Sequence, residues 1–106
     1  MREGDTVPAI APYTFDGFGR GRAHLDQSGR VVWYGHWDEQ GHQVEALFRD
    51  DEVLVRTGQT TINGQLLVGL SSGPDDLSVS PPGDLLLFKG TLEGDVEGAF
   101  SLDLGP

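Results

Sequence analysis

Apolar residues along this chain fall in short runs that polar residues, glycine and proline interrupt. In the clearest run, Val31, Trp33 and Trp37 share one parity, while Val32 and Tyr34 share the other. Successive side chains of a β-strand point to opposite faces of its sheet. A strand that is apolar on both faces is covered on both faces. The run therefore predicts a strand that lies between two packed layers.

Turn-forming residues mark the ends of further strands in the first half of the chain. We predict strands over residues 22–26, 44–49 and 53–57, with turns over 27–29, 38–42 and 50–51. The stretch 44–57 has neither glycine nor proline, which leaves a helix as an alternative. Helical spacing would place Asp51 and Glu52 where apolar residues are needed, so we favour a hairpin.

The second half of the chain follows a similar plan. We predict strands over residues 76–80, 85–92 and 96–104. One extra residue within 84–87, relative to 30–32, predicts a bulge or a one-residue change of register. A fourth strand is missing from this half, and residues 1–12 are interpreted as a remnant of that strand followed by a linker.

The two halves also echo each other residue by residue. The pattern Arg-x-Gly-x-Thr at residues 2–6 recurs at residues 56–60, and Val-Glu-Ala-Leu-Phe at 44–48 recurs as Val-Glu-Gly-Ala-Phe at 96–100. Gly29 and Gly83 each precede an apolar run. A repeat of this length is one supersecondary unit that cannot bury its apolar faces alone, so copies must stack.

Composition supports strands and narrows the partners. The chain has 106 residues, among them 16 glycines and 6 prolines, which is the size of one domain built from strands and tight turns. Its net charge of -10 predicts that neither nucleic acid nor an anionic membrane is a partner. The sequence has no cysteine, so it has no disulfide framework or thiolate metal site. We predict no cofactor.

Three segments carry a resemblance to a known family. Residues 2–8, 14–19 and 26–33 resemble a repeat of large secreted bacterial proteins that reads roughly R-E-G-D-x-x-P, T-F-x-x-F and N-x-x-G-x-V-x-F-x-A-x-L. Asp26 and Ser80 stand where that repeat has Asn, and the segment 65–75 departs from it most. The resemblance implies β-propeller-like blades of four antiparallel strands. It implies no activity and no catalytic residues.

These observations predict an all-β fold of two four-stranded, antiparallel, blade-like repeats, the second incomplete. We place repeat one at residues 13–60 and repeat two at 61–106, within a single domain. A compact two-sheet sandwich is the rival architecture. Because two blades leave apolar faces open, we predict self-association, with six blades in a trimer or eight in a tetramer.

Aromatic and histidine side chains supply the candidate ligand-binding residues, which are Tyr34, His36, Trp37 and His42. Exposed aromatic rings beside acids and amides suit stacking on a sugar, although a core role for Trp33 and Trp37 is the simpler interpretation. Tyr34 aligns with Phe88, which suggests a shared packing role. The acidic turns supply weak candidate metal ligands, which are Asp38, Glu39, Asp50 and Asp51. Their alternative role is that of solvated turns.

Three functions remain open on this basis. The first is a non-catalytic binding or scaffolding module that takes itself, a glycan or a protein as partner. The second is a purely structural spacer. The third is a hydrolase that would use the acidic turns with His36 or His42. The chain carries no signal segment, and the expectation is a piece of a longer secreted or cell-surface protein.

Overall fold

The computed structural model describes residues 4–18, 23–25, 29–62, 64–70, 77–79 and 85–104, and every regular element among them is a β-strand. The strands are β1 (Phe15–Gly17), β2 (His24–Leu25), β3 (Val31–Glu39), β4 (His42–Arg49), β5 (Glu52–Arg56), β6 (Thr61–Ile62), β7 (Gln65–Leu70), β8 (Leu77–Val79), β9 (Leu85–Leu92) and β10 (Val96–Asp103). The predicted all-β class is confirmed. The helix alternative for 44–57 is wrong, because β4 and β5 pair as a hairpin around Asp50 and Asp51.

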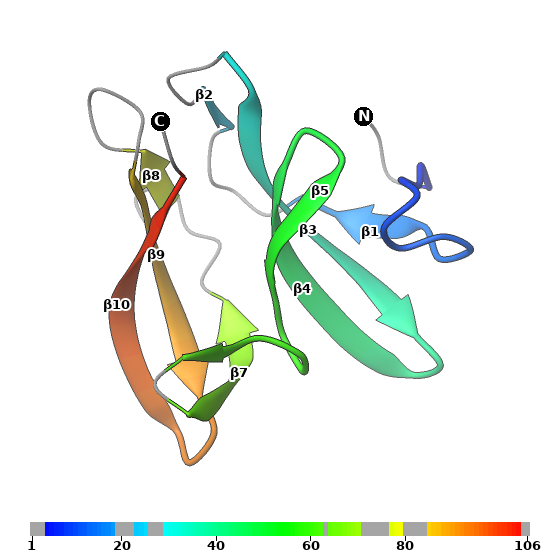
Figure 1. Ribbon diagram of the computed structural model, residues 1–106. Coiled ribbons are helices and arrows are strands. Elements are labelled where there is room, and N and C mark those ends of the chain that lie inside the picture. The colour runs from blue at the N-terminus through cyan, green and yellow to red at the C-terminus, as the bar shows by residue number, and fades with distance from the viewer. Residues whose placement is uncertain are drawn as a thin grey trace.

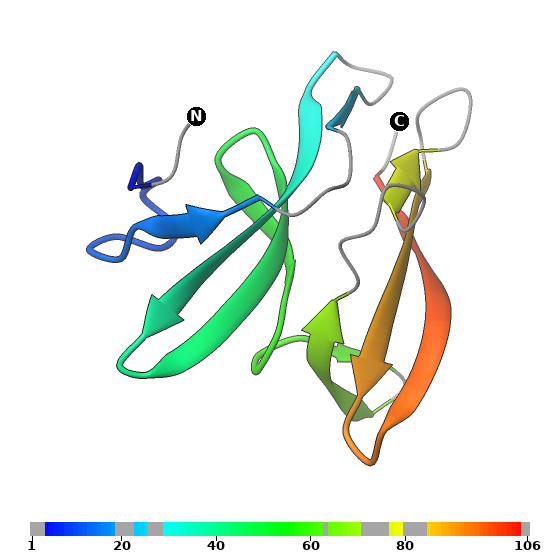
Figure 2. The same ribbon diagram turned by 180° about the vertical axis from the view of Figure 1, so that it is seen from behind.

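The described strands form two antiparallel sheets (Figures 1 and 2). The first sheet has the order β1-β3-β4-β5, with β2 also paired to β3. The second sheet has the order β10-β9-β7-β6, with β8 also paired to β9. In each sheet one long strand therefore has two short strands along one edge and a hairpin partner along the other.

The pairing registers show that the two sheets repeat one plan. Phe15 pairs with Trp37 and Leu67 pairs with Leu92, and a bulge follows at the same point, before Gly17 and Gly69. The hairpins agree, because Val44 lies opposite Trp37 as Val96 lies opposite Leu92. We call residues at matching positions counterparts. The blade-like repeats predicted from the sequence are confirmed, and beside β10 the described residues place no counterpart of β5.

The echoed Arg-x-Gly-x-Thr pattern has a structural explanation. Gly4 N–H donates to the carbonyl of Phe15 at 2.8 Å, and Gly58 N–H donates to the carbonyl of Leu67 at 2.8 Å. Both glycines have positive φ, +86° and +83°, a conformation that glycine adopts without steric cost. Because Phe15 and Leu67 are counterparts, the same turn attaches the edge strand in each half.

The first sheet buries apolar side chains on both of its faces, as predicted for β3. We call the face with Trp33 and Trp37 its front face, and the face with Val32 and Tyr34 its back face. The front face packs under the N-terminal segment in an outer core. The outer core contains Val7, Ile10, Phe15, Trp37, Val44, Ala46 and Phe48. The back face packs against the second sheet in an inter-sheet core that contains Val32, Tyr34, Leu47, Val55, Leu67, Leu70, Leu77, Leu86, Phe88 and Leu92.

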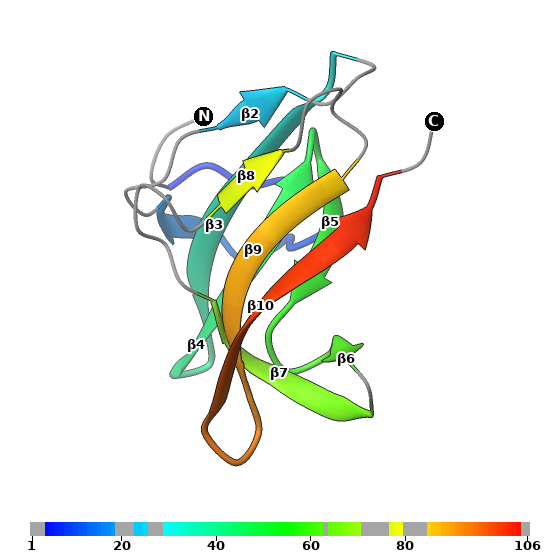
Figure 3. The same cartoon turned by 90° about the vertical axis from the view of Figure 1, so that its left-hand side faces the viewer.

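The two sheets meet front to back. Phe88 and Leu92 are the counterparts of Trp33 and Trp37, so they define the front face of the second sheet, and they lie in the inter-sheet core. The back face of the second sheet, with Leu87 and Lys89, is turned outward. Figure 3 looks onto this side, with β9 and β10 in front of the first sheet. Successive units of a repeat stack in this sense, each front on the preceding back.

Several details differ from the prediction. The strand expected at 76–80 is β8, whereas β1, β6 and β7 were not predicted. Phe88 is the counterpart of Trp33 and not of Tyr34, because Phe88 pairs with Phe100 as Trp33 pairs with Phe48. The ladder between β9 and β10 has no bulge from Leu85 onward, and Asp84, the first residue of the predicted irregularity, lies outside the described residues.

The remaining predictions concern the chain start and the repeat boundaries. Residues 4–12 form turns and no strand, while 1–3, where the strand remnant would begin, lie outside the described residues. The repeat boundaries at 13–60 and 61–106 stay a prediction.

Candidate functional site

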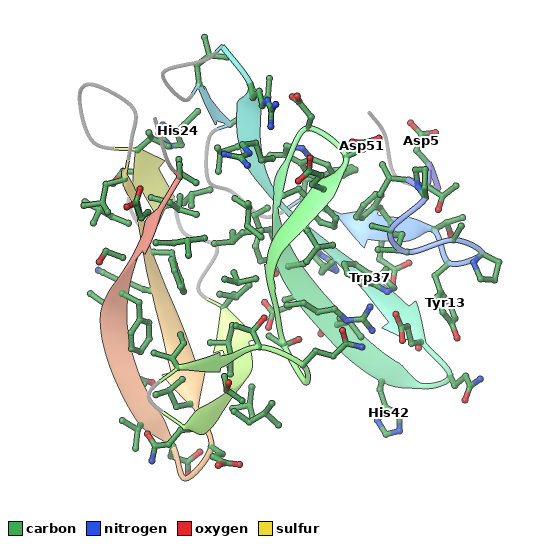
Figure 4. All side chains as sticks on the ribbon, in the orientation of Figure 1. Asp5, Tyr13, His24, Trp37, His42 and Asp51 are labelled. Atoms are coloured by element: carbon green, nitrogen blue, oxygen red, sulfur yellow. The ribbon has the colours of Figure 1, made fainter. Side chains whose placement is uncertain are left out.

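The two aromatic rings predicted to bind a ligand are both buried. Trp37 has no exposed surface and Tyr34 is almost fully covered. Trp37 lies on the front face, away from the second sheet (Figure 4). Tyr34 lies in the inter-sheet core. Neither ring can stack on a sugar unless its core opens.

Trp37 instead organises a polar cluster at one end of the first sheet. Its Nε1 donates to Glu39 Oε2 at 2.7 Å, and Arg56 Nη2 reaches the same oxygen at 2.8 Å. The Arg56 guanidinium carbon lies 5.4 Å from the centroid of the indole ring, within cation–π range. Glu39 therefore acts as the acceptor that satisfies an indole N–H and an arginine. This arrangement stabilises the fold.

The histidines do not converge. His36 lies on β3 with its Nδ1 3.3 Å from Gln43 Nε2, while His42 is exposed at the start of β4. His24 lies near the opposite end of the molecule from His42 (Figure 4). The arrangement offers no shared histidine site for the hydrolase hypothesis.

The acidic turns lie at opposite ends of β4; Asp38 holds its own hairpin turn, whereas Asp50 ties the turn between β4 and β5 to the start of β3. Asp38 Oδ1 accepts from Gly41 N–H at 2.7 Å, and Asp50 Oδ1 accepts from Val31 N–H at 3.0 Å. Asp51 is exposed at the tip of the turn between β4 and β5 (Figure 4). Across the described residues, no group of three or more His, Cys, Asp or Glu side chains could hold a metal ion.

A carboxylate seam joins the two sheets. Tyr34 on β3 donates its hydroxyl to Glu45 Oε2 at 2.5 Å. The other oxygen, Glu45 Oε1, accepts from the backbone N–H of Leu70 on β7 at 3.3 Å. A second link runs from Arg49 Nη1 to the carbonyl of Leu104 at 3.0 Å. Glu45 on the back face thus binds the backbone of the unit stacked upon it.

Removing the phenol hydroxyl is expected to weaken this seam. Tyr34→Phe leaves one oxygen of Glu45 without its buried donor, which costs about 1–2 kcal/mol of unfolding free energy. Urea unfolding followed by circular dichroism measures the loss. Tyr13→Phe is the matched control, expected to change the value by no more than about 0.5 kcal/mol. Equal effects of the two substitutions would show that the hydrogen bond from Tyr34 to Glu45 contributes nothing to the free energy of unfolding.

The back face of the second sheet carries the same seam positions without a cover. Glu97 is the counterpart of Glu45, and Lys89 is the counterpart of Tyr34. Both side chains are exposed. The hollow at this place has a volume of about 540 Å³ and is lined by Gly69, Leu70, Lys89, Gly90, Thr91, Glu97, Gly98 and Ala99. In the first sheet Tyr34 and Leu47, the counterparts of Lys89 and Ala99, are buried in the inter-sheet core.

This face was not predicted from the sequence. Lys89, Thr91 and Glu97 match no motif of catalysis or ligand binding. The available signal was the echo of Val44-Glu45 in Val96-Glu97, which places Glu97 at the position of Glu45. Glu97 marks a candidate site only because the structure shows that its counterpart, Glu45, binds the backbone of the neighbouring sheet.

The described residues contain no helix that is long and apolar enough to cross a membrane. Comparisons of the chain with models of protein families, with curated proteins and with solved structures found no significant match.

Proposed function

We propose that this chain is a non-catalytic scaffolding module that associates with itself through its blade-like sheets. The observation that carries the proposal is the front-to-back packing of two equivalent sheets. Packing of this sense uses one back face and one front face. It leaves uncovered the back face of the second sheet and the end of the first sheet's front face that carries Leu25 and Val31, while the N-terminal segment covers the other end of that front face.

A contact between a front face and a back face always leaves one further face of each kind uncovered. A contact that joins one surface to a different surface continues until the units close into a ring or extend as a stack. Two units cannot close in this way, because the inter-sheet core separates the free front face from the free back face. Self-association of whole chains covers both, and we expect a discrete trimer or tetramer.

Residues 2–8, 14–19 and 26–33, which resemble a repeat of large secreted bacterial proteins, indicate the kind of protein to which the module belongs. We propose that it belongs to the tandem-repeat family of large secreted bacterial proteins. Support comes from the quoted turn residues, because Gly4 and Gly58 make the same hydrogen bond in both halves. A glycan is not proposed at Tyr34 or Trp37, since both rings are buried. The acidic surface argues against nucleic acid and anionic membrane as partners.

Sedimentation velocity over a hundredfold range of concentration tests the proposal. We expect a species heavier than the 11.4 kDa chain at the higher concentrations, with dissociation on dilution. A chain that sediments as a monomer throughout would contradict self-association. The remaining interpretation would then be the purely structural spacer.

A further inference from the structure

Three exposed apolar side chains occupy positions that are packed in the other half of the chain. On the free front face, Leu25 and Val31 are 64% and 37% exposed. Their counterparts are Val79 and Leu86, because Leu25 pairs with Val31 as Val79 pairs with Leu86. Leu86 is fully buried in the inter-sheet core, and Val79 packs against it.

The free back face shows the complementary exposure. Leu87 is 41% exposed. Its counterpart is Val32, because His24 pairs with Val32 as Ser78 pairs with Leu87. Val32 is fully buried in the inter-sheet core. Each free face therefore exposes apolar side chains where the covered face of the same kind buries them.

The hydrogen bond of the carboxylate seam joins a glutamate on a back face to a backbone N–H of the adjacent sheet. The free faces carry both of these positions as well. Glu97 stands at the position of Glu45 on the back face. Phe18 stands at the position of Leu70, since each follows the glycine of the bulge that both halves share, Gly17 or Gly69. In the covered interface the glutamate accepts the backbone N–H of Leu70. The free faces thus offer the acceptor and the backbone position that the covered interface joins.

We infer that the back face of the second sheet docks on the front face of the first sheet in a second copy of this chain. Leu87 of one copy packs on Leu25 and Val31 of the next, and Glu97 accepts the backbone N–H of Phe18. A second copy is the occupant for the following reason. Within one chain, the front face of the second sheet already covers the back face of the first sheet. A second copy supplies the equivalent front face, that of its own first sheet, to the uncovered back face. This inference rests on the proposed self-association and specifies the surfaces that make it.

The N-terminal segment leaves this docking surface accessible. Val7 and Ile10 pack in the outer core with Trp37, whereas Leu25 and Val31 lie at the other end of β3. Phe18 and Trp33 are half-buried and pack against the outer core.

Two single variants and their mixture test the inference. Leu87→Glu places a charge on the free back face, and Leu25→Glu places one on the free front face. Each change is expected to weaken association by roughly 30-fold or more, the effect of losing a central interface contact. Light scattering should find each variant alone as a monomer. Mixed in equal amounts, they should form a dimer of twice 11.4 kDa, because each supplies the face that the other lacks.

The controls separate the surfaces from general effects of charge. Val96→Glu changes a 46% exposed apolar residue at the hairpin end of the face that is already packed, so it should keep the mass of the unmodified chain. Val31→Glu replaces Leu25→Glu if that variant does not fold, as judged by circular dichroism.

Each remaining outcome overturns a stated claim. If the unmodified chain associates while Leu25→Glu or Leu87→Glu alone keeps its full mass, the proposed faces are wrong and self-association stands. A mixture that stays monomeric, or a Val96→Glu variant that dissociates, also overturns the inference. A monomeric unmodified chain overturns self-association itself.

Discussion

Trp37→Ala is expected to lower the free energy of unfolding by about 3–5 kcal/mol, the largest effect of any substitution considered for this chain. The indole is fully buried, and its ring lies 5.8 Å from that of Phe15 and 6.0 Å from that of Phe48. Its loss leaves a cavity in the outer core and deprives Glu39 of the indole N–H. Domains of this size are stable by only about 5–15 kcal/mol in total.

Urea unfolding followed by far-ultraviolet circular dichroism measures this change without relying on tryptophan fluorescence. Val96→Ala is the control, since that side chain is 46% exposed, lies outside the proposed docking surfaces and should change stability by no more than about 0.5 kcal/mol. A loss below about 1 kcal/mol for Trp37→Ala would mean that the outer core is not packed as described. It would also reopen a surface role for this ring.

Gly90→Ala is expected to lower the free energy of unfolding by about 1–3 kcal/mol, the range for overpacked sites. A Cβ at Gly90 would lie 3.0 Å from the carbonyl oxygen of Gly69 and 3.0 Å from Leu67 Cδ1. Gly35→Ala should cost a similar amount, because a Cβ there would lie 2.8 Å from Phe15 Cε1. Gly35 lies under Phe15 of β1, and Gly90 lies under Leu67 of β7.

Gly69→Ala provides a matched control for the pair. A Cβ at Gly69 would lie 3.6 Å from Thr91 Cβ, an ordinary van der Waals contact, so the change should cost well under 1 kcal/mol. Thermal unfolding of the three variants under one buffer ranks them. If Gly69→Ala proved as damaging as the other two, the close approach of Phe15 and Leu67 to the long strands would be contradicted.

Much of the fold was predictable because its signals are local. The two-sided apolar pattern of 31–37 required cover on both faces, and the structure supplies a separate core for each. The turns at 38–42 and 50–51 carry residues that tight hairpins favour. The echo of Val44-Glu45 in Val96-Glu97 placed these hairpin strands at matching positions, and the pairing registers agree.

The edge strands were missed because their existence depends on distant partners. β1 spans three residues, one of them glycine, and only its pairing with β3 makes it a strand. β7 has contiguous apolar residues at 66–68 in place of an alternating pattern. A bulge in each pairing then changes the register, which weakened the echo over this segment.

The candidate ligand-binding role of Trp37 arose from a similar limit. The residue lies near the end of its strand, where a side chain often reaches solvent. It is buried because the non-periodic segment that contains Val7 and Ile10 folds over it. A segment with Pro8 and Pro12 shows no regular spacing from which such packing could be predicted. The stacking face was missed for the opposite reason, since its polar residues acquire meaning only from their counterparts.

Nuclear Overhauser contacts of the aromatic rings test the front-to-back packing most directly. Front-to-back packing predicts that Tyr34 shows contacts to leucine methyl groups of the second sheet, within the inter-sheet core. It predicts that the Trp33 indole shows contacts to Phe15, Phe18 and Phe48 of its own sheet. Contacts from Trp33 or Trp37 to Phe88 would place two front faces together and contradict front-to-back packing.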